Sequence, residues 1–97
     1  MLKVVDMSAT QSGMVTPQQL RAARALVGWS REKLAEKSGV PEITTRLFER
    51  GDTDPRISTA HKWRTALEAA GVIFIDEDEE AGPGVRLRKA KAKRGKR

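Results

Sequence analysis

The charged side chains of residues 29–51 are suited to binding rather than to catalysis. Arg46 carries a guanidinium that can donate two parallel hydrogen bonds to a guanine edge, whereas the carboxylate of Glu42 can only accept. The sequence contains no recognisable pair of nucleophile and base, no phosphate-cradling glycine loop and no set of metal ligands. With one histidine and no cysteine, a conventional zinc site is excluded. We therefore predict a protein that is not an enzyme and needs no cofactor.

Two short helices joined by a tight turn are predicted to hold these side chains. Ser30 is a good cap for a helix over Arg31–Ser38, and Gly39 offers the positive φ that ends it. Pro41 fits the first turn of a second helix, which we expect over Pro41–Arg50. One side of the pair is shared by Leu34, Ala35, Val40, Thr44 and Phe48, which is the pattern of a helix-turn-helix.

A further helix is predicted before this pair. The sequence TPQQ at residues 16–19 can form a capping box, with proline at the first helical position. We expect a helix over Pro17–Val27, with Leu20 and Ala23 on its buried stripe. Arg21 and Arg24 are then expected to face outward as solvated surface charges.

The chain after Pro55 predicts one more helix and a β-hairpin. Ser58 is expected to cap a helix over residues 59–70. Residues 72–75 and 84–88 are predicted strands, because the first is rich in β-branched residues and the second alternates. The connection between the strands is acidic and contains glycine and proline, so we expect a solvated loop.

The formal charge of +6 is concentrated at the C-terminal end of the chain. Residues 86–97 hold eight of the nineteen basic groups, which leaves eleven basic against thirteen acidic groups in the remainder. The high net charge alone is therefore a poor argument for a nucleic-acid surface. No apolar run approaches the roughly 20 residues that a membrane span needs, so we predict a cytoplasmic protein without membrane contact.

The order and spacing of these features resemble the Xre/Cro-type helix-turn-helix regulators. The resemblance covers about residues 16–75 and is carried in its centre by Leu34-Ala35, Gly39-Val40, Thr44, Phe48-Glu49 and Gly51. It implies a mainly α fold, a lambda-repressor-like helical bundle with a short C-terminal β-hairpin and disordered termini. We accordingly expect a leader or short strand over residues 1–15, a DNA-binding domain over 16–71, a hairpin over 72–88 that is a candidate dimerisation element, and a disordered basic tail over 89–97.

The same resemblance implies which side chains meet DNA. In such proteins the second motif helix enters the major groove, and the first points its N-terminus at the phosphate backbone. Arg31 stands where the family usually has glutamine, and a phosphate contact is expected there. Position 45 is usually a large aliphatic residue, so Thr45 is predicted to loosen the packing of the second helix. The expected contact set is Arg31, Pro41, Glu42, Ile43, Thr44, Thr45, Arg46, Leu47, Arg50 and Arg56.

Two functions follow from the resemblance. The first is a sequence-specific transcriptional regulator, a dimeric repressor or autoregulator that binds a two-fold operator in double-stranded DNA. In that function the basic tail adds affinity without reading sequence. The alternative is a related module that binds a protein, as an antiactivator or antitoxin, through the apolar side chains of Ile43 and Leu47.

Overall fold

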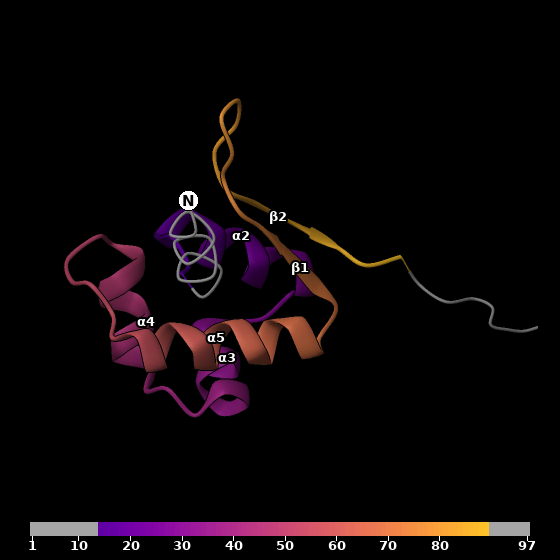
Figure 1. Ribbon diagram of the computed structural model, residues 1–97. Helices are drawn as coiled ribbons and strands as arrows, with labels where there is room; N and C mark the ends of the chain where they lie inside the picture. Colours follow the sequence, from indigo (N-terminus) through magenta and orange to yellow (C-terminus); the bar gives the residue numbers. More distant parts are fainter. Residues whose placement is uncertain (1–13, 90–97) are drawn as a thin grey trace, which may run out of the picture.

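The computed structural model describes residues 14–89, which form four helices followed by a two-stranded sheet (Figure 1). In chain order the elements are α2 (Pro17–Val27), α3 (Arg31–Ser38), α4 (Glu42–Glu49), α5 (Ile57–Ala69), β1 (Val72–Ile75) and β2 (Gly84–Leu87). The predicted mainly α fold with a C-terminal hairpin is confirmed. Of the predicted leader over residues 1–15 and the predicted disordered tail over residues 89–97, residues 1–13 and 90–97 lie outside the described residues, and Val15 is buried in the core.

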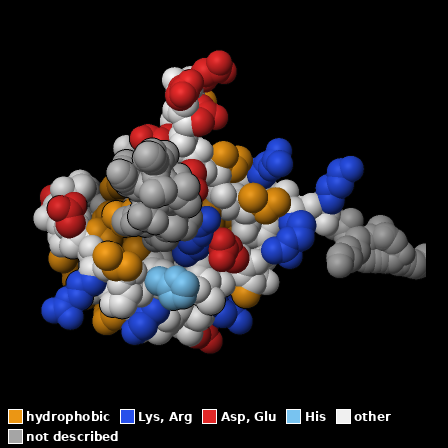
Figure 2. All heavy atoms as spheres, viewed as in Figure 1, with side chains coloured by type: hydrophobic (Ala, Val, Ile, Leu, Met, Phe, Trp, Pro, Cys, Tyr) orange, Lys and Arg blue, Asp and Glu red, His pale blue; other side chains and the backbone are white. Residues whose placement is uncertain are grey.

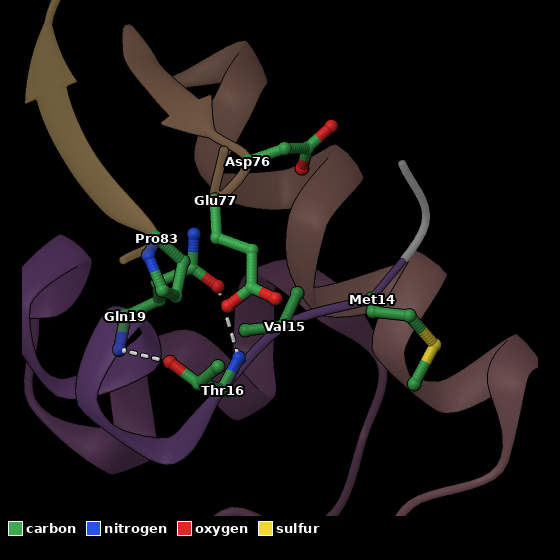
Figure 3. Close-up of a pocket in the computed structure, with 7 residues that line it drawn as sticks. All are labelled: Met14, Val15, Thr16, Gln19, Asp76, Glu77 and Pro83. Atoms are coloured by element: carbon green, nitrogen blue, oxygen red, sulfur yellow. Dashed lines mark hydrogen bonds between the residues drawn. The ribbon is translucent and has the colours of Figure 1, made fainter. Parts of the chain in front are cut away.

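The helix α2 begins with the predicted capping box. The hydroxyl of Thr16 accepts a hydrogen bond from the backbone of Gln19, and the Gln19 side chain accepts one from the backbone of Thr16, both at 3.0 Å (Figure 3). The amide nitrogen of Gln19 also donates to the carbonyls of Ile75 at 3.3 Å and Gly84 at 3.0 Å. Gln19, the third residue of α2, thus ties the start of this helix to both strands of the hairpin.

The helices α3 and α4 form the predicted helix-turn-helix. Ser30 caps α3 by accepting a hydrogen bond from the backbone of Lys33 at 2.9 Å, and Gly39 ends it at a φ of 80°. The second helix is one residue shorter at each end than predicted. Pro41 is its N-cap rather than its first residue, because ψ there is an extended 145°, and Arg50 is its C-cap.

The helix α5 begins two residues earlier than predicted. Arg56 is its N-cap in an extended conformation, and no side chain caps this end. Ser58, the expected cap, is therefore inside the first turn. Pro55 disfavours helical geometry at the residue before it but not at those after it, so the helix can begin directly behind Arg56. At 13 residues α5 is the longest helix within residues 14–89, and none of these helices is long and apolar enough to cross a membrane.

Trp63 on α5 lies at the centre of the core. Its side chain is fully buried, and its ring stacks on Phe48 of α4 with the centroids 5.0 Å apart and the planes at 24°. Such an aromatic pair contributes about 0.5–1.5 kcal/mol beyond the area that it buries. The other buried apolar residues are Val15, Leu20, Ala23, Leu34, Val40, Ala60, Leu67, Val72 and Phe74.

The hairpin shares this core with the helices. The strands β1 and β2 pair antiparallel, with Val72 opposite Leu87 and Ile75 opposite Gly84. Val72 and Phe74 alternate with more exposed neighbours, and both are buried against the helices. The loop that joins the strands extends away from the helical body (Figure 1).

Candidate nucleic-acid interface

The outward side of α4 and the start of α3 form the candidate interface. We define the interface as Arg31, Pro41, Glu42, Ile43, Thr44, Arg46 and Leu47. Pro41 and Ile43 are exposed, Ile43 to 44%, and the other members are half-buried. The opposite side of α4, with Thr45, Phe48 and Glu49, is buried. The helix is therefore fixed by one side, and the other is available to a ligand.

Thr45 does not belong to the interface, so its predicted DNA contact is wrong. The residue is completely buried, and its hydroxyl accepts a hydrogen bond of 3.0 Å from the indole nitrogen of Trp63. Phe48, one turn further along α4, stacks on the same indole. The predicted loosening of the helix is contradicted too. A threonine at this position supplies the acceptor that a buried indole N–H requires, which a large aliphatic residue cannot do.

Glu42 lies between two arginines of the interface. Its carboxylate is 3.2 Å from the Nε of Arg31 on α3 and 3.5 Å from the Nε of Arg46, one turn along α4. All three side chains keep contact with solvent, at 41% for Arg31, 27% for Glu42 and 43% for Arg46. The carboxylate aligns both guanidiniums at the surface and cancels one of their two charges.

A second and deeper ion pair joins α2 to the end of α4. The Nε and Nη2 of Arg24 each donate to a different carboxylate oxygen of Glu49, both at 2.7 Å, and Nη1 donates to the carbonyl of Trp29. The side chains keep only 15% and 4% of their exposure. The prediction that Arg24 faces solvent is wrong. Arg31 approaches the same Glu49 carboxylate at 3.9 Å and so links the two ion-pair sets.

A sequence signal for this buried pair exists. Arg24 follows Leu20 by four residues and Ala23 by one, so it lies within the apolar stripe of α2 rather than opposite it. Arg21, the other arginine expected in solvent, is exposed but donates to the backbone carbonyl of Glu49. Both arginines of α2 therefore hold the end of α4.

The remaining predicted contacts lie beyond α4. Arg50 is exposed and forms an ion pair of 3.2 Å with Asp52. Arg56 is exposed at the N-cap of α5. The structure thus groups the start of α3 with the outward side of α4, and places Arg50 and Arg56 on the segment that leaves α4.

This arrangement has a counterpart among known proteins. A family model described as Helix-turn-helix matches residues 20–69, from the middle of α2 to the end of α5. The chain belongs to the helix-turn-helix family. The matched segment contains α3, the turn and α4, and the resemblance to the Xre and lambda-repressor-like group is confirmed.

A curated member of the family is similar to most of this chain. It is the HTH-type transcriptional regulator SutR of Escherichia coli (strain K12), 36% identical over 70 residues. The similarity covers 72% of this chain but only 38% of that regulator. The chain thus spans well under half the length of the relative.

Proposed function

We propose that this helix-turn-helix chain is a DNA-binding transcriptional regulator that reads the major groove with α4. The observation that carries the proposal is the two-sided structure of α4: Thr45, Phe48 and Glu49 are buried, while Ile43 and Arg46 remain accessible. The relative's description as a transcriptional regulator supports the same function. In this function Arg46 reads a guanine and Ile43 contacts a thymine methyl group.

Arg31 is proposed to bind the phosphate backbone beside the recognised bases. It is the first residue of α3, where unpaired backbone N–H groups and the helix dipole favour an anion. Its distance of 3.2 Å from Glu42 on α4 brings the phosphate contact and the base contacts together. A correct register on the backbone would then align α4 in the groove.

A dimeric repressor is the form in which we expect the chain to act. One recognition helix contacts too few base pairs for useful discrimination, and two copies about one DNA turn apart extend the recognised site. A dimer bound to such a site in a promoter would block transcription in the cytoplasm. The promoter of the protein's own gene is one such target.

A gel shift with duplex DNA from upstream of the gene tests this function. We expect a discrete complex in moderate salt, weakened about 5- to 150-fold by Arg46→Ala, since a bidentate guanine contact contributes about 1–3 kcal/mol. Lys62→Ala is the matched control, because it removes one exposed positive charge from α5. Equal losses in both variants would contradict specific reading by Arg46.

The exposed Ile43 also supports the alternative, a module that binds a protein through α4. Leu47, the second apolar residue of that hypothesis, is half-buried, which reduces the apolar area on offer. Absence of any specific shift with the upstream DNA, together with loss of a protein partner on Ile43→Asp, would favour this second function.

A further inference from the structure

The hairpin of β1 and β2 carries opposite charges at its two ends. The loop end has five consecutive acidic residues, 76–80, all exposed. The open end has Arg86, Arg88 and Lys89, which are exposed as well. Figure 2 shows the acidic side chains at the projecting tip and basic side chains toward the other end of the hairpin. The hairpin is therefore polarised along its length.

The acidic end is held in a defined turn. The carboxylate of Asp78 accepts hydrogen bonds from the backbone N–H groups of Glu80 and Ala81, both at 2.8 Å. The backbone N–H of Asp78 in turn donates to the carbonyl of Ala81 at 2.9 Å. Asp76 lies 4.0 Å from Arg64, but within residues 14–89 no ion pair involves Glu77, Glu79 or Glu80. Glu79 and Glu80 thus lie in an ordered turn without a cationic partner in the described part of the chain, while Glu77 lines a pocket beside the start of α2 (Figure 3).

The strand β2 also has an unused edge. In the part of the chain that the structure describes, the sheet has two strands, so β1 covers one edge of β2 and no strand covers the other. Ile75 of β1 lies opposite Gly84 and is 40% exposed, and Leu87 of β2 is 46% exposed. The surface beside Gly84 is open, because a Cβ added to this glycine would be 4.0 Å from Cδ1 of Ile75. An edge strand next to exposed apolar side chains is a template for pairing with another chain.

We propose that β2 pairs antiparallel with β2 of a second copy, so that the acidic loop of each copy lies against the basic end of the other. This inference rests on the dimer in the proposed function and names its interface. The result is a continuous four-stranded sheet, which passes the three strands that independent stability requires, whereas a lone hairpin does not.

The charge pattern selects the second copy and its direction. Within one copy Arg88 and Lys89 follow β2 and the acidic turn precedes it, so the four-residue strand, about 13 Å long at 3.3 Å per residue, keeps them apart. A parallel arrangement would place the two acidic loops together. An antiparallel arrangement satisfies both ends of both copies, with reciprocal contacts across a two-fold axis.

Symmetry and charge limit the register, and Val85 is the axis residue of the proposed dimer. Opposed side chains must share one face of the sheet, so the axis passes beside a single residue of β2. If that residue were Arg86, two guanidiniums would meet directly, which is destabilising. With Val85 on the axis, Gly84 lies opposite Arg86 of the second copy, and Gly82 opposite its Arg88. The small residues leave room for the arginine side chains.

Two charge-reversed variants of the full chain provide the test. Glu77→Lys/Glu79→Lys/Glu80→Lys changes the charge of residues 76–80 from −5 to +1, and Arg86→Glu/Arg88→Glu/Lys89→Glu changes that of residues 86–89 from +3 to −3. We expect each variant alone to dimerise at least about tenfold more weakly than the parent chain in sedimentation velocity, because like charges then oppose each other. We expect an equimolar mixture to form a mixed dimer close to parental affinity, since the charges are again complementary.

Glu32→Lys/Glu36→Lys makes the same kind of charge reversal on α3, away from the hairpin, so it should dimerise as the parent does. A monomeric parent chain, unchanged dimerisation of both reversed variants, or a mixture no tighter than its components would each overturn the inference. Gel shifts on the same samples separate the two proposals: dimers that show no specific DNA complex would support the hairpin interface and contradict the DNA-binding function.

Discussion

Two sets of ion pairs meet at Arg31 but differ in burial. The deeper set, Arg24 with Glu49, keeps 15% and 4% of its side-chain exposure and joins α2 to α4. The outer set, Glu42 with Arg31 and Arg46, keeps 27–43% and lies on the interface. Charges that remain hydrated contribute about 0–1 kcal/mol as a pair, whereas a buried charge that loses its partner costs several. Burial therefore decides which set fixes the fold and which can exchange its partner for a ligand.

Arginine has two roles in these helices, one on α2 and one on α4. The guanidinium of Arg24 has its donors committed to Glu49 and to the carbonyl of Trp29. The guanidinium of Arg46 shares one carboxylate with Arg31 and is 43% exposed. When DNA approaches, the second kind of arginine can turn from a weak internal partner to a phosphate or base without disturbing the core.

The largest effect is expected from breaking the deeper set. Arg24→Ala leaves the 4%-exposed Glu49 without its bidentate partner and should lower the free energy of unfolding by about 3–5 kcal/mol in urea denaturation. The double variant Arg24→Met/Glu49→Leu removes both charges and should recover most of that loss. A loss below about 1 kcal/mol for Arg24→Ala would mean that Glu49 is hydrated or is held by Arg31 instead.

A smaller loss is expected from removing the acceptor of Trp63. Thr45→Val keeps the side-chain shape but leaves the buried indole N–H unpaired, which should cost about 1–3 kcal/mol of unfolding free energy. Thr44→Val makes the same chemical change at a half-buried neighbour and should have little effect. Equal stability of the two variants would show that the Thr45 hydroxyl is dispensable for the core.

Local signals in the sequence were sufficient to predict the four helices and two strands of the described residues. The capping box at Thr16, the cap at Ser30 and the positive-φ glycine at 39 gave the bounds of α2 and α3 as the structure has them. The start of α5 was misplaced because Ser58 is a better cap by type than Arg56, and type alone does not show where the preceding backbone turns helical.

The site was less predictable because burial depends on contacts between distant segments. Thr45 and Arg24 are polar residues that the sequence placed at the surface, and each is buried by a partner 18 or 25 positions away. Periodicity along one helix cannot reveal a Trp63 or a Glu49 on another helix. Ile43 and Arg46 were predicted to be accessible, and they are, since their side of α4 has no covering element within the described residues.

The outer set should respond in the opposite sense to the deeper one. Glu42→Gln removes a half-exposed charge, so unfolding free energy should change by no more than about 1 kcal/mol. The interface then carries two uncompensated arginine charges, and DNA affinity in fluorescence anisotropy should rise about three- to tenfold at moderate salt. Glu36→Gln, on the exposed side of α3, is the matched control. A weaker complex with Glu42→Gln would instead indicate that the carboxylate accepts a hydrogen bond from a cytosine.

The smallest effect concerns Asp78, a charge stabilised by backbone groups rather than by an arginine. The N–H groups of Glu80 and Ala81 hold the pKa of its carboxyl below the ordinary value of 3.8, because they favour the charged form. With the folded pKa lower than the unfolded one, the capped turn is favoured above the unfolded pKa and loses this support as pH falls through the folded pKa. A carboxyl-carbon NMR titration should place Asp78 below Glu79 of the same loop, and amide exchange at Glu80 and Ala81 should report the loss at low pH. Because the turn is exposed, protonation of Asp78 should not change the thermal unfolding of the helices. An Asp78 titration midpoint at or above 3.8 would show that the acidic turn is open in solution.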